Sequence, residues 1–128
     1  ADRAIAMAAS LAAVNPEAHV DVVYVVPIPL LDETQMANFK DILDMMISDG
    51  EDLLAEAEQK MGEDVAARTD SLLLTGTNPA TEIVKLIGQR DYDLLIVGNR
   101  GLSGLKEYMG SVSHKLLHAS PIPVLIAK

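Results

Sequence analysis

Residues 19–27 read HVDVVYVVP, a β-branched run of strand length that a proline closes. Its apolar residues follow one another almost without interruption. That pattern is typical of a strand buried on both faces in a parallel sheet, whereas a half-exposed strand alternates apolar and polar residues. We therefore expect this run to be an inner strand with helices packed on both of its faces.

Helical patterns flank this strand on either side. Apolar residues from Ile5 to Ala12 repeat at helical spacing before it, and a longer helix is predicted between Leu31 and Met61. The apolar stripe of the long helix consists of Met36, Phe39, Leu43, Met46, Leu53, Ala57 and Met61. Core packing is the favoured role for this methionine-rich stripe, and ligand contact is the alternative. Gly50 is expected to bend or divide the helix.

The remaining sequence continues to alternate between strand and helix. Strands are predicted at 65–76, 92–98 and 121–127, and helices at 78–90, with Asn78 as N-cap, and at 111–119. This order predicts an α/β fold with a doubly wound, Rossmann-like parallel sheet in a single domain, residues 1–128. Such a fold normally opens with a central strand. We therefore expect the domain to lack its N-terminal strand and the sequence to be a fragment of a longer chain.

Composition argues against several classes of partner. The formal net charge of −9 and ten scattered Lys and Arg residues disfavour nucleic-acid binding. The chain has no cysteine, which excludes disulfides and thiolate metal sites. We expect no membrane partner and a cytoplasmic location, because the sequence shows neither an apolar run of about 18 residues nor a secretion signal at its start.

Residues 98–111, GNRGLSGLKEYMGS, place four glycines between a predicted strand and a predicted helix. Ligands of parallel sheets bind beyond the carboxyl ends of the strands. Glycines there let backbone N–H groups approach an anion, and a helix beginning at Ser111 adds its positive dipole end. Phosphate binding is one hypothesis. The alternative is that the glycines only turn the chain and Ser111 is an ordinary N-cap, since neither GxxxxGK[ST] nor GxGxxG is present.

This glycine pattern resembles that of the universal stress proteins. Their nucleotide-binding members carry Gly, two residues, Gly, nine residues, Gly, then Ser or Thr. Here Gly98, Gly101, Gly110 and Ser111 match in kind, with eight residues between the second and third glycine. GTNPATEIVKLI and SVSHKLLHASPIPVLIAK are also similar to family segments, so the resemblance covers essentially the whole chain. It implies the fold of the adenine nucleotide alpha hydrolase-like proteins.

The resemblance implies that the chain binds ATP or AMP, with Mg²⁺ as a further candidate, and acts as a nucleotide-dependent switch in the stress response. The implied nucleotide contacts are Val25, Gly98, Arg100, Gly101, Gly110, Ser111, Val112 and Ser113. Val25 would pack beside adenine, unless it is a plain strand valine. Arg100 would reach a phosphate or the ribose, unless it is a solvated loop cation. No catalytic residue is predicted, and any ATP hydrolysis should be slow, because no general base or Walker-type lysine is present.

No metal site is predicted from the sequence. His114 and His118 have the i, i+4 spacing of metal ligands, but no third ligand accompanies them. We expect His114 to be exposed near the helix start and His118 to lie in the last turn, where a cation complements the helix dipole. His19 is expected to be a surface residue at a strand entrance.

Two other functions remain open. A nucleotide-free dimeric scaffold or chaperone-like module is favoured by the glycine loop, which is one residue shorter than the family pattern. A flavin- or adenine-cofactor enzyme is the weaker alternative. With or without nucleotide, we expect a homodimer through the C-terminal strand, because an apolar edge strand is protected by pairing with a second copy.

Overall fold

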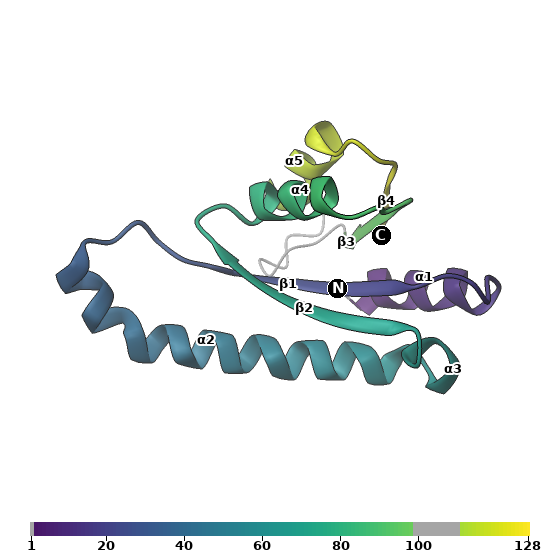
Figure 1. The fold of residues 1–128 in the computed structure, drawn as a ribbon, viewed down its shortest axis with the longest axis horizontal. Helices are drawn as coiled ribbons and strands as arrows, with labels where there is room; N and C mark the ends of the chain where they lie inside the picture. Colours follow the sequence, from purple (N-terminus) through teal and green to yellow (C-terminus); the bar gives the residue numbers. More distant parts are fainter. Residues whose placement is uncertain (1, 99–110) are drawn as a thin grey trace.

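The computed structural model describes residues 2–98 and 111–128, in which helices and strands alternate (Figure 1). The elements are α1 (Asp2–Ala13), β1 (Val20–Pro27), α2 (Glu33–Lys60), α3 (Glu63–Ala66), β2 (Thr69–Gly76), α4 (Pro79–Gln89), β3 (Leu95–Gly98), α5 (Ser111–Ala119) and β4 (Val124–Ala127). β1 pairs with β2 and β3 pairs with β4, both in parallel. The predicted α/β fold with parallel strands is confirmed.

The described strands form two separate two-stranded sheets. Within residues 2–98 and 111–128, no strand pairing joins β1 to β3. The central strand expected of a doubly wound sheet is not among the described elements and stays a prediction.

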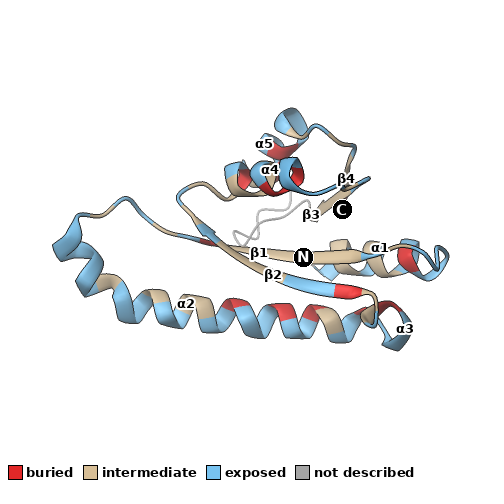
Figure 2. Ribbon diagram, in the orientation of Figure 1, coloured by how far each residue is buried: buried red, intermediate tan, exposed pale blue. Residues whose placement is uncertain are grey.

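Helices cover both faces of the β1–β2 pair. Figure 1 shows α2 on one side of these strands and α4 and α5 on the other. A buried cluster of Ala12, Met61 and Val65 joins α1, α3 and the end of α2, and partly buried Val20 and Val22 of β1 pack against it. The predicted strand with helical cover is therefore confirmed, and most of its residues are partly buried (Figure 2). Its inner position stays a prediction, because β1 pairs only with β2 among the described strands. None of the helices in the described ranges is long and apolar enough to cross a bilayer.

Three strand boundaries differ from the sequence prediction by three residues or more. β4 begins at Val124 rather than residue 121. β2 begins at Thr69 rather than residue 65, because Glu63–Ala66 form the short helix α3. Gly62 starts that turn with a φ of 84°, which only glycine adopts without strain. β3 begins at Leu95 rather than residue 92. The preceding Tyr92 bonds through its hydroxyl to Asp21 of β1.

The long helix α2 is continuous, so the expected division at Gly50 was wrong. Asp32 caps its first turn: the Asp32 side chain accepts from the Gln35 N–H, and the Gln35 side chain accepts from the Asp32 N–H. Gly50 is buried, and a Cβ there would lie 2.8 Å from Tyr24 Cδ1 and 3.0 Å from Leu73 Cδ1. The glycine allows α2 to approach the strands closely.

The buried stripe of α2 agrees only in part with the predicted one: Ala57 and Met61 of that stripe are buried, and Phe39, Leu43 and Met46 are partly buried. Gly50, Leu54 and Ala57 are the buried positions of the helix, whereas Met36 and Leu53 are 37% and 46% exposed. Met36 lies in the N-terminal part of α2, which extends beyond the strands in Figure 1. Met36 and Leu53 were therefore wrong as core predictions.

Two glycine-to-alanine substitutions should have opposite effects on the free energy of unfolding. Gly50→Ala should lower it by about 1–2 kcal/mol, because overpacking outweighs the gain of about 1 kcal/mol in helix propensity. Gly88→Ala, also within a helix but with nothing within 4 Å of the added Cβ, should raise it by about 0.5–1 kcal/mol. Urea denaturation of both variants measures the two values. A stabilised Gly50→Ala variant would contradict the close packing of α2.

Candidate functional site

The carboxyl ends of the strands lie side by side within each pair. The paired final residues are Pro27 with Gly76 in the first sheet and Gly98 with Ala127 in the second. Because the strands within each pair are parallel, both members of a pair end on the same side. This is the edge at which open α/β sheets bind their ligands.

The start of α5 is held at the end of β3. The Ser113 hydroxyl donates a hydrogen bond of 2.6 Å to the carbonyl oxygen of Gly98, and Ser113 is only 7% exposed. Ser111, the first residue of α5, is exposed. The helix therefore places its first turn, whose N–H groups have no partner within the helix, and its positive dipole end beside the carboxyl end of β3. That arrangement suits an anion.

The predicted nucleotide contacts fall in three places. Gly98, Ser111, Val112 and Ser113 lie at the β3–α5 junction, where the hydrogen bond directly joins Gly98 to Ser113. Val25 lies on β1, in the other strand pair, opposite Leu74. Arg100, Gly101 and Gly110 lie outside the described residues.

The predicted surface residues His19 and His114 are exposed, and His118 lies in the last turn of α5 as predicted. His114 and His118 lie on α5 with their ring centroids 4.7 Å apart in an edge-to-face arrangement. The His19 side chain at the start of β1 is 56% exposed.

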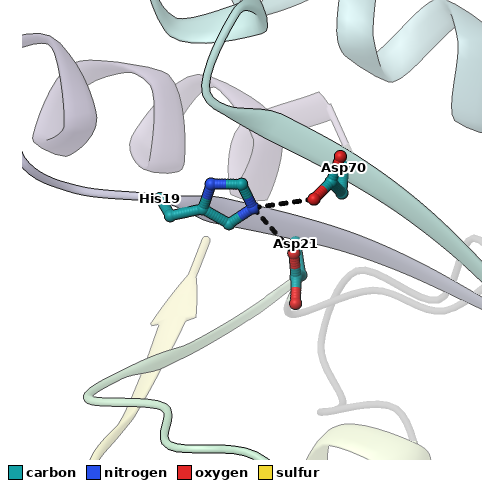
Figure 3. A group of neighbouring side chains, drawn as sticks. All are labelled: His19, Asp21 and Asp70. Carbon is teal, nitrogen blue, oxygen red and sulfur yellow. Dashed lines mark hydrogen bonds and ion pairs between the residues drawn. The ribbon is translucent and has the colours of Figure 1, made fainter.

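His19 nevertheless has partners that the sequence analysis missed. At the amino ends of β1 and β2, its Nε2 atom lies 3.0 Å from Asp70 Oδ2 and 3.3 Å from Asp21 Oδ1 (Figure 3). The spacing of His19 and Asp21 offered a signal, because residues i and i+2 of a strand share a face. Asp70 joins them only through the strand register, which local sequence patterns do not reveal.

The Asp21 carboxylate sits in a polar network near the start of β3. Its Oδ2 atom accepts a hydrogen bond of 2.5 Å from the Tyr92 hydroxyl and lies 3.3 Å from Arg90 Nη1. Burial raises the pKa of Tyr92, and the hydrogen bond to Asp21 raises it further. The phenol therefore remains a hydrogen-bond donor to Asp21 at neutral pH.

A family model described as the universal stress protein family matches residues 1–128. The chain belongs to this family. Universal stress protein YxiE from Bacillus subtilis (strain 168) is 40% identical over 81 residues, which cover 62% of this chain and 53% of that relative. The chain covers 53%, 66% and 51% of the length of three curated relatives that it matches.

Solved universal stress proteins share the fold. UspA from Lactobacillus plantarum superposes with a TM-score of 0.86 at 19% identity, covering 98% of this chain and 87% of that one. A universal stress protein from Archaeoglobus fulgidus, solved in complex with dAMP, gives a TM-score of 0.72 at 22% identity, covering 99% and 86% of the two chains. At these identities the likeness establishes the fold alone. The predicted family membership is confirmed.

Proposed function

We propose that this universal stress protein binds an adenine nucleotide at the carboxyl edge of its strands. The observation that carries the proposal is the hydrogen bond from Ser113 to Gly98, which holds the first turn of α5 at the end of β3. A helix N-terminus in this position is suited to a phosphate group. The dAMP complex of the Archaeoglobus fulgidus relative supports adenine as the base.

The proposed contacts have distinct roles. Exposed Ser111 and the N–H groups of the first turn of α5 would bind phosphate, and Val25 would pack beside adenine. Ser113 would act by positioning, because its hydroxyl proton is already donated to Gly98. From the family pattern, we add Arg100, Gly101 and Gly110, together with Val112 and Gly98, to the proposed set.

The proposed role is a nucleotide-dependent switch in the stress response, located in the cytoplasm. Nucleotide occupancy would change the surface that residues 98–111 offer to partners. Such a switch requires binding and no turnover. ATP and AMP are both candidates, and Mg²⁺ would accompany the phosphates of ATP.

Isothermal titration calorimetry of the full-length protein tests this function. ATP and AMP are titrated separately, each with and without Mg²⁺, and binding of one nucleotide per chain is the expected result. If ATP binds more tightly when Mg²⁺ is present than when it is absent, the metal would be assigned to the phosphates of ATP. No heat and no melting shift with either nucleotide would refute the proposal.

Ser111→Asp should weaken nucleotide binding by about tenfold or more, since its carboxylate would repel phosphate. The same carboxylate at a helix N-terminus favours the helix, so the melting temperature of the free protein should not fall. Ser48→Asp adds an equal charge on an exposed position of α2 and should leave the affinity unchanged. Equal losses in both variants would point to the net charge of the chain instead of the proposed site.

A nucleotide-free dimeric scaffold is the second candidate. Among the described strands, β4 pairs only with β3, so its other edge is available for pairing with a second copy. A homodimer through β4 is proposed for both functions. Sedimentation equilibrium with and without ATP distinguishes the switch from the scaffold. A dimer whose dissociation constant is the same with and without nucleotide would favour the scaffold.

A further inference from the structure

We propose that His19, Asp21 and Asp70 form a binding site for a divalent transition-metal ion, with Zn²⁺ as the preferred occupant. The three side chains offer one imidazole nitrogen and two carboxylate oxygens, which all lie within 4.8 Å of one another. This site is at the amino ends of β1 and β2, whereas the proposed nucleotide site is at the carboxyl ends of the strands. The metal site is therefore independent of the proposed function.

The backbone explains why these three residues meet. His19 and Asp21 are two residues apart where the chain enters β1, so their side chains point to the same face of the strand. Asp70 is the register partner of Asp21 on β2, and partners in adjacent strands project side by side. The ligands are thus carried by two hydrogen-bonded strands, which hold them in place before a metal binds.

The distances between these atoms match the edges of a metal coordination shell. Ligands at about 2.0–2.1 Å from a tetrahedral Zn²⁺ ion are about 3.3 Å from one another. His19 Nε2 lies 3.3 Å from Asp21 Oδ1 and 3.0 Å from Asp70 Oδ2 (Figure 3). Small side-chain rotations would accommodate the ion.

The burial of Asp21 is a second observation that favours a cation at this cluster. The Asp21 side chain is 7% exposed, and within residues 2–98 and 111–128 its Oδ1 is the one buried side-chain polar atom without a hydrogen-bond partner. A buried carboxylate oxygen of this kind costs free energy unless a cation or donor satisfies it. Oδ1 accepts no hydrogen bond and lies 3.3 Å from His19 Nε2, whereas Oδ2 accepts hydrogen bonds from Tyr92 and Arg90.

The surroundings of Asp21 resemble those of a metal ligand. Ligating carboxylates are generally oriented by hydrogen bonds to their second oxygen, which Tyr92 and Arg90 supply here. The side chains of His19 and Asp70 are 56% and 69% exposed, so an ion has a path from solvent and a water molecule has room to complete the shell. Mixed imidazole and carboxylate ligands favour Zn²⁺ over Mg²⁺, which prefers oxygen ligands in an octahedral shell.

The site is tested on the full-length protein after treatment with a chelator and in the absence of nucleotide. ZnCl₂ is titrated by calorimetry, and CoCl₂ by visible absorption, in which a tetrahedral Co²⁺ site gives far stronger bands than hexaaquo Co²⁺. One equivalent of each ion should bind. His19→Gln and Asp70→Asn, both at exposed positions, should each weaken Zn²⁺ binding by about tenfold or more without unfolding the protein.

Two controls exclude other sources of binding. A His114→Gln/His118→Gln double variant should keep full Zn²⁺ affinity, because the second histidine pair lies on α5. MgCl₂ should bind far more weakly, since mere attraction to a chain of charge −9 would not distinguish the ions. Absent Zn²⁺ binding, equal Mg²⁺ binding, or loss confined to the double variant would overturn the proposal. A protonated His19 bridging the two carboxylates would then account for the cluster.

Discussion

Leu116→Ala is expected to lower the free energy of unfolding by about 2–5 kcal/mol, because it removes a fully buried side chain and leaves a cavity. Leu116 lies in α5 at 0% exposure and is one of the two largest completely buried side chains in the part of the chain that the structure describes. Urea denaturation followed by circular dichroism measures the loss. Since α5 carries Ser111 and Ser113, the variant should also bind nucleotide more weakly at temperatures near its lowered melting point.

The adjacent residue supplies the matched control. Leu117 is 44% exposed on the same helix. Leu117→Ala should therefore change the free energy of unfolding by about 0.5 kcal/mol or less. Equal losses at the two positions would mean that α5 packs in a different rotation from the one described.

Arg68→Met should lower the free energy of unfolding by about 2–3 kcal/mol, because hydrogen bonds from a charged donor are lost at several acceptors together. Arg68 Nη1 donates to the carbonyl oxygens of Ala18 at 2.7 Å and Asn15 at 3.0 Å, and Nη2 donates to that of Ala12 at 3.1 Å. The side chain is 21% exposed, so water replaces these contacts poorly. Urea denaturation measures this change as well.

A surface lysine is the control for loss of a positive charge. Lys85 is 64% exposed and lies 3.5 Å from Glu82 on the same helix. Lys85→Met should therefore change stability by about 0.5 kcal/mol or less. If Arg68→Met changed the free energy of unfolding as little as Lys85→Met, the hydrogen bonds of the Arg68 guanidinium would not stabilise the packing of α1 against the start of β2.

Much of the candidate nucleotide site could be predicted from local patterns. The strand that ends at Gly98 and the helix that begins at Ser111 were both anticipated, and the structure joins them through Ser113. The proposed contact of Val25 with adenine stays a prediction. It depends on how β1 of the first sheet is placed relative to α5, which follows β3 of the second sheet. Such spatial relations do not follow from hydrophobic periodicity.

Local patterns in the sequence specify the class of fold and the residues at which its elements begin. Continuous β-branched runs and intervening apolar periodicities act over a few residues, so the parallel α/β alternation follows from the sequence alone. Asn78 was likewise predicted to cap α4, and its side chain accepts a hydrogen bond from the Thr81 N–H. Capping of this kind depends only on neighbours in the chain.

Contacts between segments far apart in sequence follow from the tertiary structure and not from local patterns. Gly50 was expected to interrupt a helix, yet it is the position at which α2 approaches Tyr24 and Leu73. No basic residue lies in the last turn of α1, and Arg68 supplies a cation there by donating to the carbonyl oxygen of Ala12. The register of β1 with β2 brings Asp70 to His19 and Asp21. Each of these contacts depends on strand register or helix packing, which form only when distant parts of the chain come together in the folded state.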